Sequence, residues 1–442
     1  MSLLERWDSP KYVLAPMVDG SELAWRMLGR KYGVQLSFTP MINATSFLSN
    51  TKYRQSCLQF APEDRPLIVQ FCANSSEKFL KCAKLVQPFC DAVDLNLGCP
   101  QGIAKKGHYG AFLQEEWELL KEIVGKASLE LDIPVTCKIR IFEDIERTVQ
   151  YAKFLEAAGA SMLTVHGRTR DMKGQKTGLA DWDQIKAVKE AVKIPVIANG
   201  NIQYLSDVHR CLDITKVDAV MSAEGHLHNP ALFSGLQPSA YTMSFEYLEF
   251  VEKYPTSIQI IRGHIFKLCH FALDEHSEFR PTVGSAQSIE EIKKALQKMQ
   301  NQCSSCIGNS LTELPHPHWI CQPYERPKLA SELKNLENSV DSIDRSDIQE
   351  ANNSGLNKRI MLTEQRRSRK AMKKEAKLAK KLAVIEGKLI CASCNRNRKS
   401  ANCARSVCRT CCQDQNESDP RMINIFCSAH QYHRKIMTAL ID

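Results

Sequence analysis

Short apolar runs alternate with amphipathic stretches through the first 235 residues of the chain. An uninterrupted run of β-branched and other apolar residues is typical of a strand buried on both faces of a parallel sheet. Eight such runs occur, at residues 12–17, 36–41, 66–71, 91–97, 134–141, 161–167, 195–200 and 218–225. The stretches between them, such as 114–131 and 145–158, have apolar residues at helical spacing. This alternation predicts an α/β fold, a TIM (β/α)8 barrel, because the alternative, a doubly wound sheet, seldom contains so many regular units.

The pattern changes after residue 240, where strand-like runs give way to helical ones. Ile258–Leu268 and Ser288–Met299 have apolar residues three and four positions apart, and Ser288 with Glu291 resembles a helix N-cap. A stretch rich in Ser, Asn, Asp and Glu, a basic stretch and a cysteine-rich block follow. We therefore predict a barrel catalytic domain over 1–240, a small helical domain over 241–327, a flexible linker over 328–357, a basic helix over 358–387 and a cysteine-rich module over 388–435.

The composition is that of a globular protein, with 43% hydrophobic and 25% charged residues. No apolar run reaches the ~18 residues of a membrane-spanning helix, and the N-terminus does not read as a secretory signal. The net charge of +9 is local, because residues 357–381 contain eleven basic and two acidic side chains. Such a segment indicates a polyanionic partner, either nucleic acid or an acidic membrane surface, with a solvated helix as the plain alternative.

The cysteines indicate a compartment and a metal. Eighteen cysteines without a secretory signal indicate a reducing environment, and seven of them lie after Lys388. Paired CxxC spacing there predicts a zinc site, with a redox-labile tail as the alternative. The predicted ligands are Cys391, Cys394, Cys408 and Cys411, and a second site would draw on Cys403, Cys412, Cys427, His430 and His433.

A second group of cysteines and histidines, near the end of the helical domain, also has spacing compatible with zinc. It consists of Cys303, Cys306, His316, His318 and Cys321. CxxC pairs arise by chance in a chain this rich in cysteine, so coincidence is the alternative here.

Polar and basic side chains stand where nearly every predicted strand ends. In a parallel barrel, the carboxyl ends of the strands and the loops that follow them form the active site. The residues at these ends are Pro16, Met17, Val18, Gln70, Asn96, Lys138, Arg140, His166, Arg168, Asn199, Gly200, Asn201, Glu224 and Gly225. The last two predicted strands both end near a glycine, which lets backbone N–H groups approach an anion, so we expect a phosphate there. The alternative is that each glycine only permits a tight turn.

The segment Asn96-Leu97-Gly98-Cys99-Pro100 places a cysteine in a turn directly after a predicted strand. Cys99 has no CxxC partner, so neither a metal site nor a redox disulfide explains it. A thiol at this end of the barrel is able to donate a proton as a general acid, whereas an inert turn cysteine is the alternative. The next loop, residues 101–110, contains three glycines, and we expect it to move as a lid.

These motifs, in this order and spacing, resemble those of the tRNA-dihydrouridine synthases. The matching segments are APMVD, FTPM, VQFCAN, DLNLGCP, CKIR, TVHGRT, IANGNI and SAEG. GCPQGIAKKGHYGAFL, SAEGHLHNPALF and PHWICQPYERP are similar to the eukaryotic branch that acts at positions 16 and 17 of tRNA. The resemblance covers residues 8–325 and implies an FMN-binding barrel followed by a helical tRNA-binding domain.

The resemblance also implies a role for each strand-end residue. It assigns the isoalloxazine ring to Pro16, Met17, Val18 and Gln70, further FMN contacts to Lys138 and His166, and the ribityl-phosphate end to Asn199, Gly200, Asn201, Glu224 and Gly225. It assigns the uracil to Asn96, Arg140 and Arg168, and proton donation to Cys99. Asn201 departs from the family, in which an acidic residue is more common, although an asparagine is still able to hydrogen-bond the ribityl chain.

The reaction implied is reduction of the C5=C6 bond of uracil. NADPH, or NADH, reduces FMN; a hydride passes from flavin N5 to C6, and Cys99 protonates C5. We expect tRNA as the partner, no membrane, a monomer, and Zn²⁺ in the C-terminal module. We also expect a cytoplasmic location, with the nucleus as the alternative, because a basic segment fits nuclear import as well as RNA.

Two other functions are compatible with such a barrel. One is a free-pyrimidine reductase of the dihydroorotate type, but a small substrate needs no helical domain, basic segment or cysteine module. The other is a non-catalytic RNA-binding protein, which would have no use for Cys99, Lys138 and His166 at the strand ends.

Overall fold

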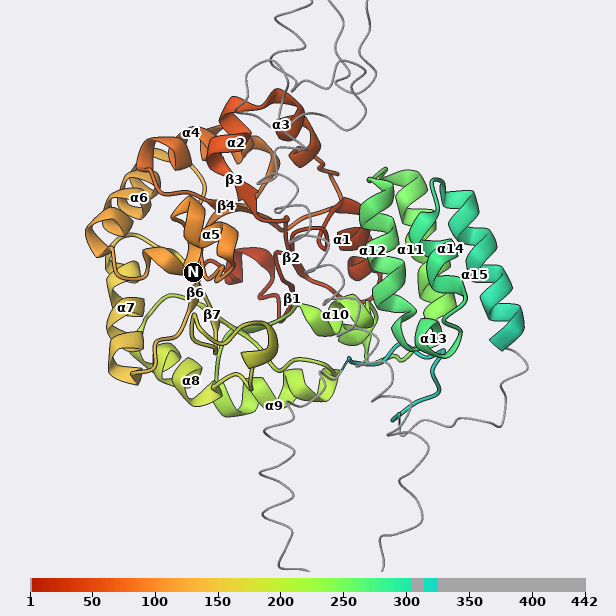
Figure 1. The fold of residues 1–442 in the computed structure, drawn as a ribbon. Coiled ribbons are helices and arrows are strands. Elements are labelled where there is room, and N and C mark those ends of the chain that lie inside the picture. The colour runs from red at the N-terminus through yellow and green to blue at the C-terminus, as the bar shows by residue number, and fades with distance from the viewer. Residues whose placement is uncertain (1, 304–313, 325–442) are drawn as a thin grey trace, which may run out of the picture. The chain divides into compact units, whose positions relative to one another are not determined.

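Eight parallel strands close into a barrel in the computed structural model, which describes residues 2–303 and 314–324. The ring consists of β1 Tyr12–Leu14, β2 Leu36–Phe38, β4 Leu67–Cys72, β5 Ala92–Leu97, β6 Val135–Arg140, β7 Leu163–His166, β8 Val196–Asn199 and β9 Ala219–Ser222. Successive strands pair in parallel, β2 pairs with β4, and β9 pairs with β1 through Met221 and Val13. The predicted TIM barrel is therefore confirmed, as Figure 1 shows.

Each of the eight predicted strands exists, but most are shorter than the apolar run that predicted them. β1, for example, ends at Leu14, two residues before Pro16, which lacks the backbone N–H that would continue a ladder. One further strand, β3 Ile42–Asn43, was not predicted. It pairs only with the end of β4, and two residues give no periodicity to detect.

A layer of helices surrounds the strands (Figure 1). It contains α1 Leu23–Lys31, α2 Ala44–Ser49, α3 Thr51–Cys57, α4 Ser76–Val86, α5 Gly102–Gly107, α6 Trp117–Glu130, α7 Ile145–Ala157, α8 Trp182–Ala191, α9 Leu205–Thr215 and α10 Glu224–His228. The helices predicted over 114–131 and 145–158 are α6 and α7. The predicted lid loop contains the short helix α5, in which Ala104 is buried. Its movement remains a prediction.

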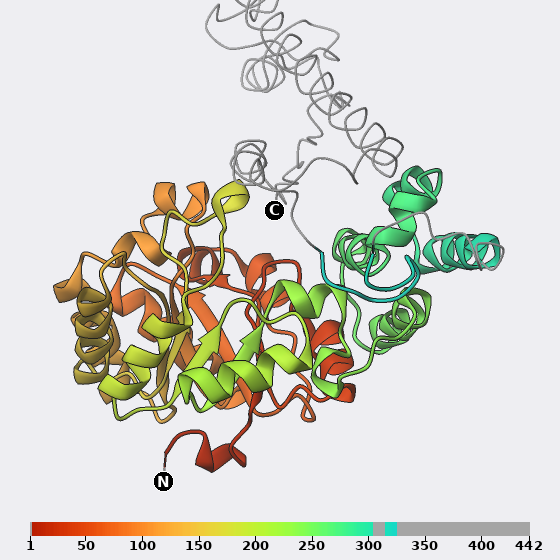
Figure 2. The same cartoon turned by 90° about the horizontal axis from the view of Figure 1, so that it is seen from below.

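Alternate residues of the strands have different surroundings. On β6, Val135, Cys137 and Ile139 pack in the core between strands and helices, whereas Lys138 reaches across the barrel to β8. The apolar layer inside the barrel includes Leu3 and Leu4 from the N-terminal segment. This segment lies below the ring of helices in Figure 2. The interior thus has an apolar layer at one end and polar side chains toward the carboxyl ends of the strands.

Five helices lie to one side of the barrel, next to α1 and α10 (Figure 1). They are α11 Ala240–Lys253, α12 Ile258–Leu268, α13 His270–Glu275, α14 Phe279–Ser285 and α15 Ile289–Cys303. The helices predicted over 258–268 and 288–299 are α12 and α15. Ser288 caps α15 by accepting a hydrogen bond of 3.2 Å from the Glu291 backbone N–H, as predicted.

The remaining predicted parts, the linker, the basic helix and the cysteine-rich module, lie outside the described residues, and all the domain boundaries remain predictions. Within residues 2–303 and 314–324, no helix has both the length and the apolar character needed to cross a membrane.

Candidate active site

A chain of hydrogen bonds joins buried polar side chains inside the barrel. Asn96 Nδ2 donates to Gln70 Oε1 over 2.8 Å, and Gln70 Nε2 donates to Asp94 Oδ2 over 2.9 Å. Thr136 donates to the other carboxylate oxygen of Asp94 over 2.7 Å. Burial raises the pKa of Asp94 to about 6, although the hydrogen bonds from Thr136 and Gln70 oppose this. Through Asp94, the barrel interior fixes the orientation of Gln70, and through Gln70 that of Asn96.

Sequence reasoning missed Asp94 and Thr136. Each lies two positions before a residue that it did identify, Asn96 on β5 and Lys138 on β6. Because side chains two apart on a strand share a face, this period-two relation was the available signal.

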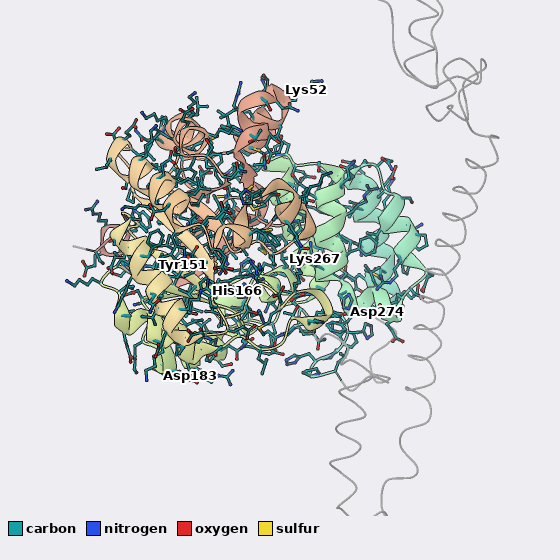
Figure 3. The ribbon with its side chains drawn as sticks, turned by 60° about the vertical axis from the view of Figure 1, so that its left-hand side comes forward. Lys52, Tyr151, His166, Asp183, Lys267 and Asp274 are labelled. Atoms are coloured by element: carbon teal, nitrogen blue, oxygen red, sulfur yellow. The ribbon has the colours of Figure 1, made fainter. Side chains whose placement is uncertain are left out.

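Lys138 is a buried cation whose hydrogen bond goes to a neutral amide. Its Nζ donates to Asn199 Oδ1 over 2.9 Å, and Asn199 Nδ2 donates to the Met221 carbonyl over 3.0 Å. Burial, followed by the nearby charge of Arg140, lowers the pKa of Lys138 to about 7. His166, labelled in the middle of the barrel in Figure 3, has a pKa held well below its usual value by burial and by Lys138. His166 is therefore neutral at pH 7.

The turn that carries Cys99 is held from both sides. Asn96 Oδ1 accepts hydrogen bonds from the backbone N–H groups of Gly98 and Cys99, over 3.1 and 2.9 Å. Arg140 Nε donates to the Gly98 carbonyl over 2.8 Å. Gly110 has φ +69°, and a Cβ on it would lie 2.7 Å from the Cys99 carbonyl oxygen, so glycine is required there. Cys99 itself is partly exposed, in a turn whose shape these neighbours determine.

Three arginine and lysine side chains gather at the carboxyl ends of β6 and β7, which we call the barrel mouth. Arg140 Nη1 donates to the Thr169 carbonyl over 2.8 Å, and Arg168 Nη1 lies 3.0 Å from His166 Nε2. Lys138 and Arg140 form no ion pair with any residue in the described part of the chain. Burial and the charge of Arg168 lower the pKa of Arg140 to about 10. Since a neighbouring cation helps to lower each of these two pKa values, Arg140 that of Lys138 and Arg168 that of Arg140, an anion at the barrel mouth would relieve the repulsion.

The two glycine-containing loops after β8 and β9 touch one another. A Cβ on Gly225 would lie 2.3 Å from the Ile202 carbonyl oxygen, and one on Gly200, at φ +119°, would lie 2.5 Å from the Ala180 Cβ. Asn201 also has a positive φ, of 62°. Its Oδ1 accepts from Arg168 Nη2 over 3.0 Å and from the Ala180 N–H over 2.9 Å, and its Nδ2 donates to the Ala180 carbonyl over 2.9 Å. Its side chain therefore shapes this loop.

The other predicted site residues lie at the same end of the barrel, because all strands of the ring are parallel. After β1, the Met17 N–H donates to Ser21 Oγ over 3.0 Å, and Val18 is 61% exposed beyond Pro16. Glu224 is exposed at the start of α10. The four predicted zinc ligands in the C-terminal module lie outside the described residues.

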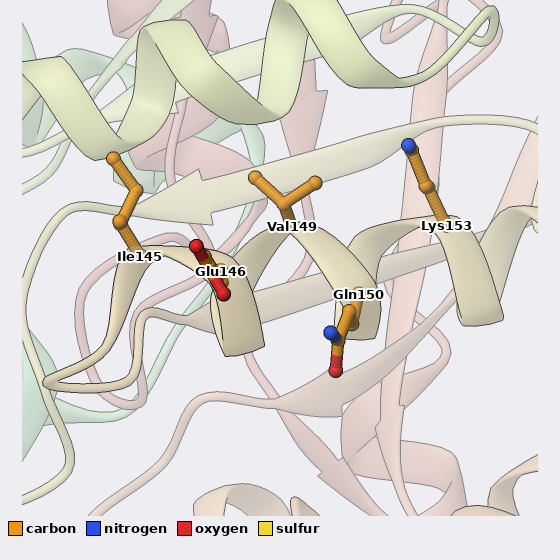
Figure 4. Close-up of a pocket in the computed structure, with 5 residues that line it drawn as sticks. All are labelled: Ile145, Glu146, Val149, Gln150 and Lys153. Atoms are coloured by element: carbon orange, nitrogen blue, oxygen red, sulfur yellow. The ribbon is translucent and has the colours of Figure 1, made fainter.

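Figure 4 shows a pocket on the surface of a single helix. All its lining residues belong to the outer helix α7: Ile145, Glu146, Val149, Gln150 and Lys153. It contains none of the strand-end residues, so it is not part of the candidate active site.

Comparison with known proteins gives a consistent result. Residues 13–345 match the family Dihydrouridine synthase (Dus). A tRNA-dihydrouridine(16/17) synthase (NAD(P)+)-like protein of Mus musculus is 46% identical over 412 residues, covering 91% of this chain and 84% of that protein. The tRNA-dihydrouridine(16/17) synthase of Saccharomyces cerevisiae is 42% identical over 362 residues, covering 74% and 86%. A tRNA-dihydrouridine(20a/20b) synthase-like protein of Homo sapiens is 39% identical over 256 residues, covering 57% and 80%.

Proposed function

The chain belongs to the dihydrouridine synthase family, and from that premise we propose that it is a tRNA-dihydrouridine(16/17) synthase. It would reduce the C5=C6 bond of uracil at positions 16 and 17 in the D-loop of tRNA, with NADPH or NADH as the source of electrons. The observation that carries the proposal is the juxtaposition, at one end of the barrel, of a hydrogen-bonded cysteine turn and buried basic side chains that form no ion pair among the described residues.

The donor set at the barrel mouth suits FMN. Gln70, Lys138 and Asn199 offer amide and ammonium groups that match the polar edge of an isoalloxazine ring, and the cation of Lys138 would stabilise the negative charge of the reduced ring. Pro16, Met17 and Val18 would contact the ring, and His166 would offer a neutral imidazole. The loops containing Asn199, Gly200, Asn201, Glu224 and Gly225 would hold the ribityl phosphate. When bound, FMN would supply the hydride that reduces C6 of the uracil.

The chain's own residues supply the proton and the positioning. Cys99 would donate its thiol proton to C5 of the uracil as a general acid. Asn96 and Arg140 hold the peptide group that precedes Cys99, through the Cys99 N–H and the Gly98 carbonyl. Asn96, Arg140 and Arg168 would be the nearest donors to the uracil, and the surplus positive charge would attract the phosphates beside it. A uridine must leave its stack to reach this site, at a cost of about a few kcal/mol.

Three finer features belong to the same proposal. The helical domain and the basic segment over 358–387 would contact tRNA phosphates, which makes binding dependent on salt. The cysteine-rich module would bind Zn²⁺ through Cys391, Cys394, Cys408 and Cys411 as a structural ion. The enzyme would act as a monomer in the cytoplasm, with the nucleus as the alternative location.

The direct test is reconstitution. The purified full-length chain, with FMN, NADPH and an unmodified tRNA transcript, should form dihydrouridine at positions 16 and 17, mapped by mass spectrometry of nuclease fragments. A flavin-containing protein that reduces only free pyrimidines would favour the dihydroorotate-type reductase instead. A protein that binds tRNA but no flavin would favour a non-catalytic RNA-binding function.

The basic segment can be tested in the same assay. A chain that ends at residue 357 should keep its flavin and its position specificity, but should bind tRNA more weakly and with a flatter dependence on salt, because residues 358–442 contain 20 basic and seven acidic side chains. An unchanged salt dependence would show that these residues do not contact RNA.

A further inference from the structure

Three side chains from separate segments of the helical unit converge in the part of the chain that the structure describes. His276 directly follows α13, Cys303 is the last residue of α15, and His318 lies in the segment 314–324. One ligand atom from each side chain lies within 4.8 Å of the other two. Two described members of the group Cys303, Cys306, His316, His318 and Cys321 belong to this cluster, Cys303 and His318, whereas Cys306 lies outside the described residues. His276 was not part of that group, because a histidine 27 positions earlier has no sequence relation to it.

All three side chains are buried. Their residues are 6% (His276), 5% (Cys303) and 6% (His318) exposed. Cys303 Sγ lies 3.1 Å from His318 Nε2, and the two imidazole rings meet at 68° with centroids 5.5 Å apart. One ligand atom of each side chain is therefore close enough to the other two to share a single ion.

From this geometry we propose that His276, Cys303 and His318 bind a Zn²⁺ ion. Zinc takes imidazole nitrogen and thiolate sulfur at about 2.0–2.1 and 2.3 Å in a tetrahedron, which separates a sulfur from a nitrogen ligand by about 3.6 Å. The 3.1 Å between Cys303 Sγ and His318 Nε2 is close to that separation. Two nitrogen ligands would lie about 3.3 Å apart, so the upper limit of 4.8 Å for the whole cluster leaves at most about 1.5 Å for the ligand atoms to approach one another. The fourth position of the tetrahedron would be open to water or another ligand.

A carboxylate stands behind one of the ligands. Glu278 Oε1 lies 3.9 Å from His276 Nδ1, and Gln302 Nε2 donates to the same oxygen over 2.8 Å. A histidine that binds a metal through one nitrogen commonly turns the other nitrogen toward a carboxylate, which fixes the ring and makes it a better ligand. Glu278 would do this when His276 coordinates through Nε2, by approaching about 1 Å closer than the present 3.9 Å.

The ion would join the helical unit to the barrel. The segment that carries His318 pairs with the residues before α11: the Ala240 N–H donates to the Trp319 carbonyl over 2.8 Å, and the Cys321 N–H to the Pro238 carbonyl over 2.9 Å. A zinc ion on His318 would therefore connect the end of α15 to the junction between the barrel and α11. Its role would be structural, and it does not depend on the enzymatic proposal.

Metal content tests this site. We would measure zinc per chain by plasma mass spectrometry in the purified full-length protein and in His276→Asn, Cys303→Ser and His318→Asn. Each variant should contain one zinc ion fewer than the parent. Zinc in the C-terminal module is the same in every sample, so it cancels in the comparison.

Two matched controls should keep the parental zinc content. His316→Asn changes a histidine two positions from His318 that is not in the cluster, and Cys57→Ser changes a partly buried thiol on α3. If the three cluster variants are folded and keep the parental zinc content, the proposal is wrong.

A donor exchange guards against simple misfolding. His318→Cys replaces one zinc ligand with another, so it should keep the parental zinc content and should lose as much thermal stability on chelation as the parent does. His318→Asn should contain one zinc ion fewer and should lose less thermal stability on chelation. If Cys303 and His318 form only a hydrogen-bonded pair, the parent, His318→Cys and His318→Asn will have the same zinc content and the same response to chelation, and that result would overturn the proposal.

Discussion

Two buried polar clusters in this protein differ in whether their charged side chains have oppositely charged or hydrogen-bonding partners within the protein. The interface cluster lies where α1 and α10 of the barrel meet α11 and α12, and consists of Glu22, Trp25, His226, Tyr247 and His264. Its carboxylate is fully engaged: Glu22 accepts from Tyr247 Oη over 2.7 Å and lies 3.0 Å from His264 Nε2. Trp25 stacks on His264 at 4.0 Å. The one carboxylate of this cluster therefore has partners of complementary character within the protein.

The mouth cluster, defined as Gln70, Asn96, Lys138, Arg140, His166 and Asn199, is less evenly balanced. Lys138 and Arg140 donate to neutral oxygens of Asn199, Gly98 and Thr169, and within the described residues neither forms an ion pair with a carboxylate. The buried Asp94 attracts Lys138 through space, but its oxygens accept from Gln70 and Thr136. Retaining an unbalanced buried cation costs stability, and proteins tolerate this where a ligand completes the site. We therefore expect substitutions in the mouth cluster to reduce activity more than stability, and substitutions in the interface cluster to reduce stability more than activity.

The largest expected effect is on activity at the barrel mouth. Cys99→Ala should reduce dihydrouridine formation by roughly 10²–10⁴-fold, because a general acid contributes about that much. Flavin content, NADPH oxidation and thermal stability should be unchanged, since the substitution leaves the backbone contacts of the turn in place. Dihydrouridine is measured by mass spectrometry of the tRNA, with Cys57→Ala as the thiol control. Undiminished tRNA turnover would remove Cys99 from its role.

The interface cluster should show the reverse behaviour. Glu22→Ala leaves His264 and Tyr247 buried without their acceptor, so we expect a loss of about 3 kcal/mol in the free energy of unfolding. Activity per folded molecule should stay near the parental value at low temperature. Urea denaturation followed by circular dichroism measures the stability.

Glu246→Ala is the matched control for Glu22→Ala. Glu246 pairs with Lys31, whose side chain is 50% exposed, and accepts from the Tyr32 hydroxyl over 2.9 Å, whereas its own side chain is 19% exposed. Because its partners still reach water, its loss should cost less than that of Glu22, about 1–2 kcal/mol. Equal losses from the two variants would contradict the view that burial distinguishes them.

The sequence predicts the strands and helices of the barrel better than it predicts which side chains meet in the buried clusters. Eight apolar runs locate eight strands, because burial on both faces leaves a local signature in each strand. Parallel strands also place their polar ends together, which is why Lys138 and Asn199 were identifiable although 61 residues separate them. Glu22 and His264, 242 residues apart, have no such rule to join them, since their contact depends on how α12 packs against α1. For the same reason, the sequence did not predict that His276 lies beside Cys303 and His318: that contact depends on how the helices pack.

Another test uses the buried side chain of Lys138. Because the folded protein lowers the pKa of Lys138 to about 7, the unfolded chain binds an extra proton between about pH 7 and the ordinary lysine pKa. The contribution of Lys138 to the parent's free energy of unfolding therefore rises as the pH increases from about 7 toward the ordinary lysine pKa, and it is lowest below pH 7. Lys138→Met should stabilise the apoprotein by on the order of 1–3 kcal/mol at pH 6, after allowing for the lost bond to Asn199.

The same substitution should weaken flavin binding. The gain in stability from Lys138→Met should become smaller as the pH rises toward 10. Riboflavin, which lacks a titrating phosphate, should bind the parent progressively more weakly as the pH rises above about 7. It should bind Lys138→Met weakly at every pH. Thermal denaturation and flavin fluorescence titration give the two readouts. A destabilised variant that keeps its flavin would place Lys138 with the interface cluster, as a structural group.

The smallest effect should come from Asn201, where the family more often has an acidic residue. Asn201→Asp keeps the oxygen that accepts from Arg168 and the Ala180 N–H, and its negative charge strengthens the first of these bonds. It also replaces the amide that donates to the Ala180 carbonyl with a second acceptor, which costs a similar amount. We therefore expect a stability change within about 1 kcal/mol and a change in FMN affinity of less than about threefold. A tenfold or larger change in FMN affinity without a change in stability would mean that the Asn201 side chain contacts the cofactor directly. The expected small change instead follows from its hydrogen bonds to Arg168 and Ala180, through which the side chain shapes the loop around Gly200.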